Sequence, residues 1–233
     1  MDQCIHAARI LGSQGWLEDA AVALEAGRVR WLGPRAQAPE ATQLIELTEG
    51  LLAPGFIDLQ VNGGGGVLFN DARSPEALAR IASAHRRFGT TGMLPTLISD
   101  TPQAMQEALQ AARDAIAEGV PGVLGLHLEG PFLTPERCGV HRPEHFRSPS
   151  EAEIEGLCAH GLPHLLMTVA PEQVCPEAIA RLSQGGVHLC AGHSAASFEQ
   201  ARAAFDAGLG GVTHLFNAMP PLSGRGPGLL GAA

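Results

Sequence analysis

The sequence predicts an α/β fold in which parallel strands alternate with helices and form part of a (β/α)8 barrel. Beyond Pro54, short apolar segments alternate with segments that carry helix start and stop signals. The polar residues that interrupt the apolar segments lie at or beyond their carboxyl ends, where barrel enzymes build their sites. A doubly wound sheet is the alternative, but no dinucleotide-binding fingerprint follows the first strand. In a barrel, residues from distant strands point at one axis, which favours the barrel.

Six strands and five intervening helices are expected in this part of the chain. The predicted strands are 56–62, 91–98, 123–129, 164–170, 187–193 and 211–216. The predicted helices are 74–89, 101–119, 148–161, 175–186 and 197–208. Ser74 is the expected N-cap of the first helix, Pro75 its first residue and Gly89 its stop. The first 50 residues are β-rich, with short apolar runs broken by Gly and Pro.

Composition and charge exclude several classes of protein. The net charge of −9 and the absence of a Lys/Arg run argue against a nucleic-acid-binding protein. The N-terminus lacks the basic and apolar regions of a signal peptide, and no apolar run of about 18 residues predicts a membrane helix. The five cysteines are scattered and never in CxxC spacing, so we expect neither disulfides nor a Cys-rich zinc site. Free cysteines are typical of a reducing compartment, so we expect a cytoplasmic location.

Polar residues at the expected strand ends form a candidate metal site. They are Asp58, Gln60, Asn62, His127, Glu129, His193 and His214. Within this set Glu129, His193 and His214 supply one carboxylate and two imidazoles, which suit a catalytic divalent metal with one position left for water. A single strand-end histidine is more often a hydrogen-bonded structural residue. Glu129 is harder to explain in that way, because a buried carboxylate needs a partner.

Other candidates have a functional and a structural interpretation. His127, two residues before Glu129, is expected in the core or behind the metal ligands. His141 and His145, with Cys138 nearby, lie in a loop rich in Pro and Gly, where a solvated or substrate-facing role is favoured over a metal site. The glycines 63–66 predict a flexible turn more than a phosphate cradle. Arg225, in the segment 222–231, lies either in a mobile loop or in an anion clamp.

Four segments resemble successive motifs of the N-acetylglucosamine-6-phosphate deacetylases, and the resemblance runs from about residue 5 to the last residue. The segments are LLAPGFIDLQVNGGGGVLFND, GLHLEGPFL, AGHSAASFEQARAAFDAG and THLFNAMPPLSGRGPGLLGA. The resemblance implies a barrel of the metal-dependent hydrolase type beside a small β-sandwich built from both chain ends. It thus implies that residues 1–52 are the N-terminal part of the sandwich and residues 53–233 an incomplete barrel. The family reaction removes acetate from N-acetylglucosamine 6-phosphate and leaves glucosamine 6-phosphate.

The resemblance also implies roles for individual residues. Glu129, His193 and His214 would be the metal ligands, for zinc first and for iron or cobalt as alternatives. Gln60 and Asn62 stand where many amidohydrolases carry the histidines of a second metal, so one metal is expected. Contacts to the phosphorylated amino sugar would come from His141, Asn217, Ala218 and Arg225. The family resemblance further implies a homodimer for the complete protein.

The general acid/base of the family is an aspartate at the end of the eighth strand. No Asp in this chain follows the sixth expected strand, so that residue is expected beyond residue 233. The alternative to the enzyme is therefore a fragment that binds metal or sugar phosphate without turnover. A third interpretation, a barrel hydrolase for another amide or a cyclic urea, has no use for the phosphate-binding segment around Arg225. Unpaired edges on the first and sixth strands predict poor solubility unless something covers them.

Overall fold

The computed structural model describes residues 1–233 and divides them into two compact units. The first unit is Met1–Gly55 and the second is Phe56–Ala233. The domain limits expected from the resemblance, 1–52 and 53–233, remain a prediction. Each unit has its own sheet, and the second unit contains all of the candidate site residues.

The first unit is a four-stranded mixed sheet in the order β3-β2-β1-β4. Its strands are β1 (Gln3–Gly12), β2 (Gly15–Glu25), β3 (Arg28–Pro34) and β4 (Gln43–Leu47), with a 3-10 helix at Arg35–Gln37. β1 and β3 each pair with β2 antiparallel, and β4 runs parallel to β1. Alternate residues of β2 belong to different apolar clusters, Ala20 and Val22 to one, Ala21 and Ala23 to the other. The sheet thus packs apolar side chains on both faces, as the period of two in a strand allows.

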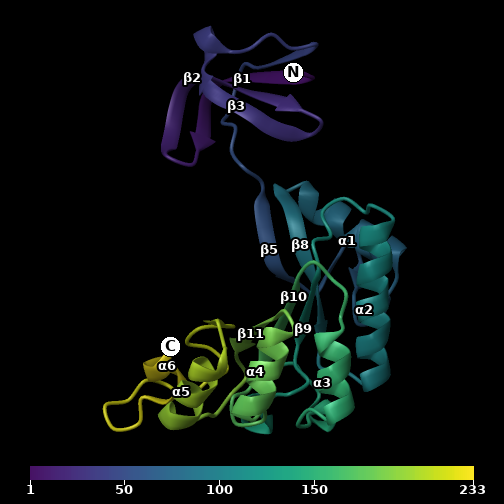
Figure 1. Ribbon diagram of the computed structural model, residues 1–233, viewed down its shortest axis with the longest axis vertical. Coiled ribbons are helices and arrows are strands. Elements are labelled where there is room, and N and C mark those ends of the chain that lie inside the picture. Colours follow the sequence, from purple (N-terminus) through teal and green to yellow (C-terminus); the bar gives the residue numbers. More distant parts are fainter. The chain divides into compact units, whose positions relative to one another are not determined.

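The second unit is built on a six-stranded parallel sheet in the order β12-β11-β10-β9-β8-β5 (Figure 1). The strands are β5 (Phe56–Val61), β8 (Thr90–Ile98), β9 (Leu126–Glu129), β10 (Leu165–Val169), β11 (Val187–Ala191) and β12 (Gly211–Val212). Strands that follow one another in the chain are neighbours in the sheet, and all pairs are parallel. The sheet curls as part of a barrel, with β5 and β12 at its two edges. The predicted fold class and its six strands are confirmed.

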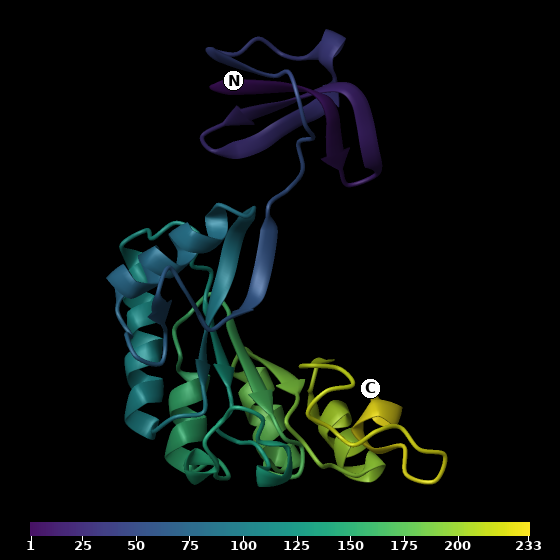
Figure 2. The same ribbon diagram turned by 180° about the vertical axis from the view of Figure 1, so that it is seen from behind.

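Helices connect these strands and cover one face of the sheet (Figures 1 and 2). They are α1 (Pro75–Arg86), α2 (Pro102–Ala117), α3 (Glu151–Cys158), α4 (Pro176–Gln184) and α5 (Phe198–Ala207), with short 3-10 helices at Pro135–Arg137 and Pro143–His145. Ser74 caps α1 by accepting a hydrogen bond from the Ala77 amide, as predicted. Ser150 and Ser197 begin α3 and α5 with capping boxes.

The main core lies between the sheet and its helices. Along β10, Leu165, Met167 and Val169 belong to this core and are fully buried. Thr168, between them, belongs to the opposite face of the sheet, which also carries the candidate site. The helix-facing side therefore stabilises the fold, and the inner side is left for polar groups.

Three local expectations are corrected by the structure. β12 ends at Val212, so His214 follows the sixth strand and does not lie on it. The end of the segment 222–231 is not loop, because Gly228–Ala232 forms helix α6. The glycine run forms a turn only at Gly65 and Gly66, which connect strand β6 (Gly63–Gly64) to its antiparallel partner β7 (Val67–Leu68).

His160, between α3 and β10, should make stability depend on pH. It is 7% exposed, and its Nδ1 accepts a hydrogen bond from the Leu162 amide at 3.0 Å. Burial, followed by the charge of Arg113, lowers the pKa of His160 below its ordinary value. The unfolded chain therefore binds this proton more readily. Stability should be fully present above the unfolded pKa of about 6.5 and decline as the pH falls below it.

The variant His160→Asn tests this expectation, because the Asn oxygen can replace the Nδ1 acceptor and cannot titrate. Urea unfolding at pH 7.5, 6.5 and 5.5 should show a smaller acid loss of stability in His160→Asn than in the wild type. His164→Gln, at an exposed position two residues beyond Leu162, is the control and should keep the wild-type dependence. If the stability of His160→Asn depends on pH as steeply as that of the wild type, the acid sensitivity comes from other groups.

Candidate metal centre and substrate site

Glu129 is the centre of the candidate site. It is the last residue of β9 and only 3% exposed. Its Oε1 lies 2.7 Å from Nε2 of His214 and 3.2 Å from Nε2 of His193. Burial opposes the charge of Glu129, but the imidazoles of His141, His193 and His214 outweigh it and hold its pKa well below the usual range. The side chain is therefore a carboxylate, surrounded by nitrogen donors.

His193 and His214 reach this carboxylate from loops with unusual backbone conformations. His193 follows β11 with φ of 48°, and His214 follows β12 with φ of 55°. Residues other than glycine rarely adopt this left-handed region, and such strain of about 1 to 3 kcal/mol is concentrated at functional sites. The ring of His193 is fixed because Nδ1 donates to the Arg137 carbonyl at 2.8 Å, which leaves Nε2 directed at Glu129.

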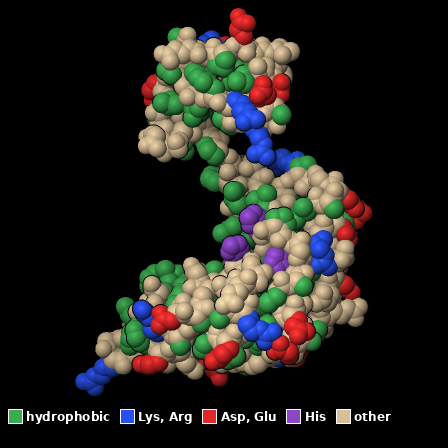
Figure 3. Space-filling view, viewed as in Figure 1, with side chains coloured by type: hydrophobic (Ala, Val, Ile, Leu, Met, Phe, Trp, Pro, Cys, Tyr) green, Lys and Arg blue, Asp and Glu red, His purple; other side chains and the backbone are tan.

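One ligand atom from each of Glu129, His193 and His214 lies within 4.8 Å of the others. A carboxylate oxygen and two imidazole nitrogens that converge in this way, on a buried carboxylate, fit a divalent metal ion. Without a metal, protons must bridge the close N···O contacts. Consistent with this, burial lowers the pKa of His193, but the hydrogen bonds to Glu129 and Arg137 and the charge of Glu129 raise it more, and the net pKa is raised. Figure 3 shows several histidine side chains, in purple, gathered on one face of this unit.

His141 joins this cluster although it comes from the loop after β9. It is 4% exposed, and its ring packs edge-on against His193 with centroids 4.6 Å apart. Of the two roles expected for His141, the solvated one is therefore wrong, and the substrate-facing one stays a prediction. The Ser99 amide donates to Nδ1 at 3.2 Å, so Nδ1 is an acceptor and Nε2, which is 3.8 Å from Oε1 of Glu129, carries a proton. His145, only partly buried, and Cys138 do not belong to the group of potential metal ligands.

Gln60 holds the second oxygen of Glu129. Its Nε2 donates to Oε2 of Glu129 at 2.9 Å, across the sheet from β5. The Asp58 carboxylate accepts a hydrogen bond from the backbone N–H of Gln60 at 3.1 Å, which stiffens the end of the same strand. Asn62 follows the strand, and its carbonyl accepts from the Phe69 amide at 2.9 Å. The Gln60 side chain thus meets the carboxylate as a donor.

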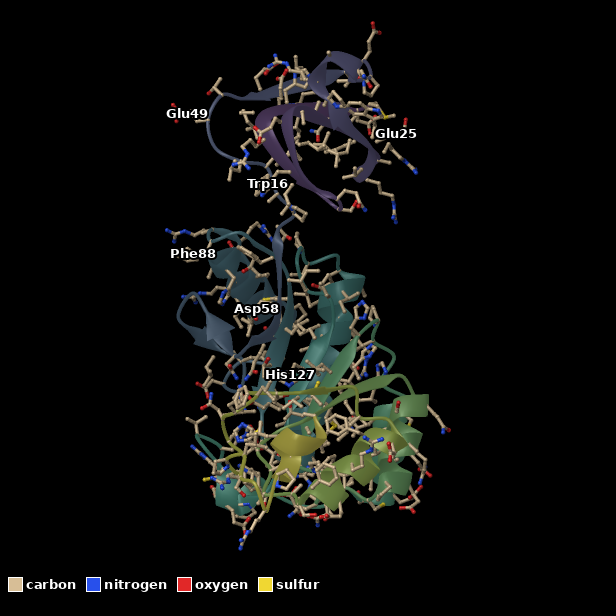
Figure 4. All side chains as sticks on the ribbon, turned by 90° about the vertical axis from the view of Figure 1, so that its left-hand side faces the viewer. Trp16, Glu25, Glu49, Asp58, Phe88 and His127 are labelled. Carbon is tan, nitrogen blue, oxygen red and sulfur yellow. The ribbon has the colours of Figure 1, made fainter.

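His127 lies beneath the ligands in a chain of hydrogen bonds across the inner face of the sheet (labelled in Figure 4). Its Nδ1 is 3.2 Å from Oγ1 of Thr96 and its Nε2 is 2.9 Å from Oγ1 of Thr168. Thr168 continues the chain to Oγ1 of Thr213 at 2.7 Å. Burial lowers the pKa of His127 to about 4, so the ring is neutral at pH 7 and bridges the two threonines. His127 is therefore a buried core residue behind the candidate ligands, in line with the sequence interpretation.

The expected substrate residues after β12 are less closely joined to the cluster. Ala218 has φ of 51°, and its carbonyl accepts from the Ser194 amide at 3.1 Å, next to His193. Asn217 is exposed, and its amide donates to the His214 carbonyl at 2.6 Å. Arg225 is exposed on a turn between Ser223 and Gly226. The structure therefore joins Ala218 and Asn217 to the ligand loops by backbone contacts and leaves Arg225 at the surface.

Sequence reasoning missed several residues that hold the site together, namely Thr96, Ser99, Thr168, Glu172, Ser194 and Thr213. Thr96 and Thr168 gave a signal, because each is a polar residue between apolar neighbours near the end of its strand. The others lie in loops, where a polar side chain is ordinary and gives no signal.

A family model described as "Amidohydrolase family" matches residues 51–229. The chain belongs to this family. The match covers the whole six-stranded sheet and every ligand of the candidate metal centre. Amidohydrolases are generally metal-dependent, and the Glu129 cluster gives this amidohydrolase chain a site of the matching kind.

Two relatives are named as deacetylases of phosphorylated amino sugars. The amidohydrolase chain is 47% identical over 187 residues to an N-acetylgalactosamine-6-phosphate deacetylase of Shewanella sp. (strain ANA-3), covering 80% of the chain and 48% of the relative. It is 37% identical over 217 residues to an N-acetylglucosamine-6-phosphate deacetylase of Haemophilus influenzae, covering 93% and 57%. The chain thus spans about half the length of these two relatives.

The fold is also similar to a solved N-acetylglucosamine-6-phosphate deacetylase from Pasteurella multocida. The TM-score is 0.93 at 34% sequence identity, over 99% of this amidohydrolase chain and 61% of the other. A mutant of the Mycobacterium smegmatis enzyme in complex with N-acetyl-D-glucosamine-6-phosphate aligns with a TM-score of 0.88 at 33% identity, over 99% and 60%. In the amidohydrolase chain, no helix is both long and apolar enough to span a membrane.

Proposed function

We propose that the protein is a metal-dependent amide hydrolase that removes acetate from N-acetylglucosamine 6-phosphate. The observation that carries the proposal is the convergence of Glu129, His193 and His214 at the carboxyl ends of three strands. Deacetylase relatives along most of the chain support the substrate class. Zinc is the metal that best suits one carboxylate and two imidazoles, with iron and cobalt as alternatives.

In this proposal the chain's residues orient the substrate and its reacting carbonyl. A divalent ion at the Glu129 cluster would act as a Lewis acid, polarising the amide carbonyl and lowering the pKa of water. Gln60 fixes Glu129 through Oε2, and the Arg137 carbonyl fixes the ring of His193. His141 presents an Nε2–H toward the same point and is suited to donate to the substrate. The general acid/base aspartate implied by the family resemblance is proposed to lie beyond residue 233.

The galactosamine epimer is the second candidate substrate, because the 47% identical relative is an N-acetylgalactosamine-6-phosphate deacetylase. Acetate release should be measured with the zinc-loaded complete protein, which is proposed to supply the general acid/base aspartate, using both 6-phosphates and unphosphorylated N-acetylglucosamine. Turnover of one or both phosphorylated sugars, and little of the free sugar, is expected. Equal turnover with and without the phosphate would contradict the proposed substrate class.

Arg225 and the segment Asn217–Ala218 are proposed to bind the phosphate. Arg225→Ala should then raise KM for the 6-phosphate substrate by roughly tenfold to a hundredfold and change kcat less, since a lost charged hydrogen bond costs about 1.5 to 3 kcal/mol. Arg202→Ala is the matched control, because Arg202 is also exposed and pairs only with Asp206 on α5. A KM unchanged by Arg225→Ala would remove Arg225 from the phosphate site.

We also propose a location and an oligomeric state for the complete protein. All five cysteines are free, which fits a reducing compartment such as the cytoplasm. A homodimer follows from the family resemblance alone and is readily checked by light scattering.

A further inference from the structure

Glu172 lies in the turn that follows β10, beside the loop that carries His193. The turn is well fixed, because the Ala170 amide donates to the Phe132 carbonyl and the Gln173 amide donates to the Ala170 carbonyl, each at 2.8 Å. The Glu172 carboxylate accepts two hydrogen bonds from the neighbouring loop. They come from the Ser194 hydroxyl at 2.7 Å and the Ala195 amide at 2.6 Å. One fixed carboxylate therefore holds the two residues that follow His193.

The segment that begins at His193 depends on such partners. His193 has the left-handed φ of 48°, a conformation that persists only where the surroundings enforce it. Its carbonyl accepts from the Thr134 amide at 3.1 Å, and the Ser194 amide donates to the Ala218 carbonyl at 3.1 Å. Ser194 is fully buried, and its hydroxyl oxygen also accepts from the Ala196 amide at 3.0 Å. Loss of Glu172 would leave the buried hydroxyl proton and the Ala195 amide without their acceptor.

We infer that Glu172 is a positioning residue for the metal centre and acts through Ser194. It holds the backbone of His193 so that Nε2 points at Glu129. Through the bond from Ser194 to Ala218, the same contact ties the segment Asn217–Ala218 to the metal ligand. The inference rests on the proposed function, in which His193 is a metal ligand and Asn217–Ala218 meets the substrate.

A carboxylate is required at this position because both partners are donors. A glutamine offers one acceptor oxygen, so either the Ser194 hydroxyl or the Ala195 amide loses its acceptor. Glu172→Gln, which keeps the size of the side chain, should therefore show much of the effect of Glu172→Ala. Glu177→Gln is the matched control, since Glu177 is an exposed carboxylate in the first turn of α4, a few residues away.

The test is cobalt binding to the purified protein, followed by visible absorption and by chelator competition. Glu172→Gln and Glu172→Ala should bind cobalt about tenfold more weakly than the wild type and change the ligand-field spectrum, in the range typical of residues that orient metal ligands. Glu177→Gln should behave as wild type. Ser194→Ala should weaken cobalt binding similarly, and adding it to Glu172→Ala should produce little further loss, because the two residues act in one linkage.

Hydrogen exchange at the Ala195 amide, measured without metal, separates this inference from the proposed function. Faster exchange in Glu172→Gln than in Glu177→Gln is expected. A wild-type protein that binds no cobalt at the Glu129 cluster would refute the proposed function, while the exchange comparison still decides whether Glu172 holds the loop. Wild-type cobalt affinity, spectrum and Ala195 exchange in both Glu172 variants would overturn the inference. Variants that only melt earlier, with an unchanged cobalt spectrum, would also overturn it.

Discussion

Glu129→Gln should abolish metal binding while leaving the fold intact. The substitution is nearly isosteric, but the neutral amide cannot supply the charge that His193 and His214 face at 3.2 and 2.7 Å. Loss of a direct ligand should cost more than the 10- to 100-fold typical of residues behind the ligands, so affinity should fall by more than about a hundredfold. Metal content after dialysis, together with acetate release, measures the effect.

Glu144→Gln is the control for this variant, since Glu144 is exposed in the loop that carries His141. It should retain wild-type metal content and activity. In the metal-free protein the histidines outweigh the burial of Glu129, so the metal-free Glu129→Gln protein should unfold earlier than the metal-free wild type, and metal content should be compared under conditions in which both proteins are folded. A Glu129→Gln protein that retains stoichiometric metal and turnover would show that this carboxylate is not a ligand.

Gly125→Ala should be among the most damaging single substitutions in the second unit. Gly125 directly precedes β9, and a Cβ there would lie 2.0 Å from the carbonyl oxygen of His164. That oxygen accepts the hydrogen bond from the Leu126 amide at 3.0 Å, so relief of the clash separates the start of β9 from β10. The backbone cannot move aside as the end of a flexible side chain can. We therefore expect the free energy of unfolding, measured with urea, to fall by about 3 kcal/mol.

Gly210→Ala provides the matched comparison. Gly210 also directly precedes a strand, β12, but a Cβ there meets only the Leu189 carbonyl oxygen at 3.9 Å. It should change stability by well under about 1 kcal/mol. Because β9 ends at Glu129, Gly125→Ala should also weaken metal binding. Equal stabilities for the two variants would mean that the backbones of β9 and β10 do not approach each other closely at Gly125.

The alternation of strands and helices could be predicted because the local signals for helix caps and apolar strands agree with the global fold. Ser74 and Pro75 begin α1 as predicted, and the six apolar segments form the six parallel strands. The errors fall where tertiary contacts decide. β12 is only two residues long, because beyond Val212 the chain leaves the sheet and turns left-handed at His214. The helix Gly228–Ala232 forms within a glycine-rich segment, which composition assigns to loop.

The candidate ligands were visible in the sequence for a physical reason. Glu129 ends an apolar strand, and a charged residue in such a place requires partners. The burial of His141 was not visible, because it follows from contacts with Ser99 and His193, which lie far from it in the sequence. Nothing in the sequence distinguishes Glu172 from an ordinary loop residue. Its two acceptor bonds appear only once the turn after β10 lies beside the loop after β11.

The most direct test of the account is an anomalous-scattering map of crystals of the zinc-loaded protein. The account predicts one zinc peak, about 2.0 to 2.2 Å from a carboxylate oxygen of Glu129 and from Nε2 of both His193 and His214. A zinc site elsewhere, or a second peak bound by Gln60 and Asn62, would contradict it.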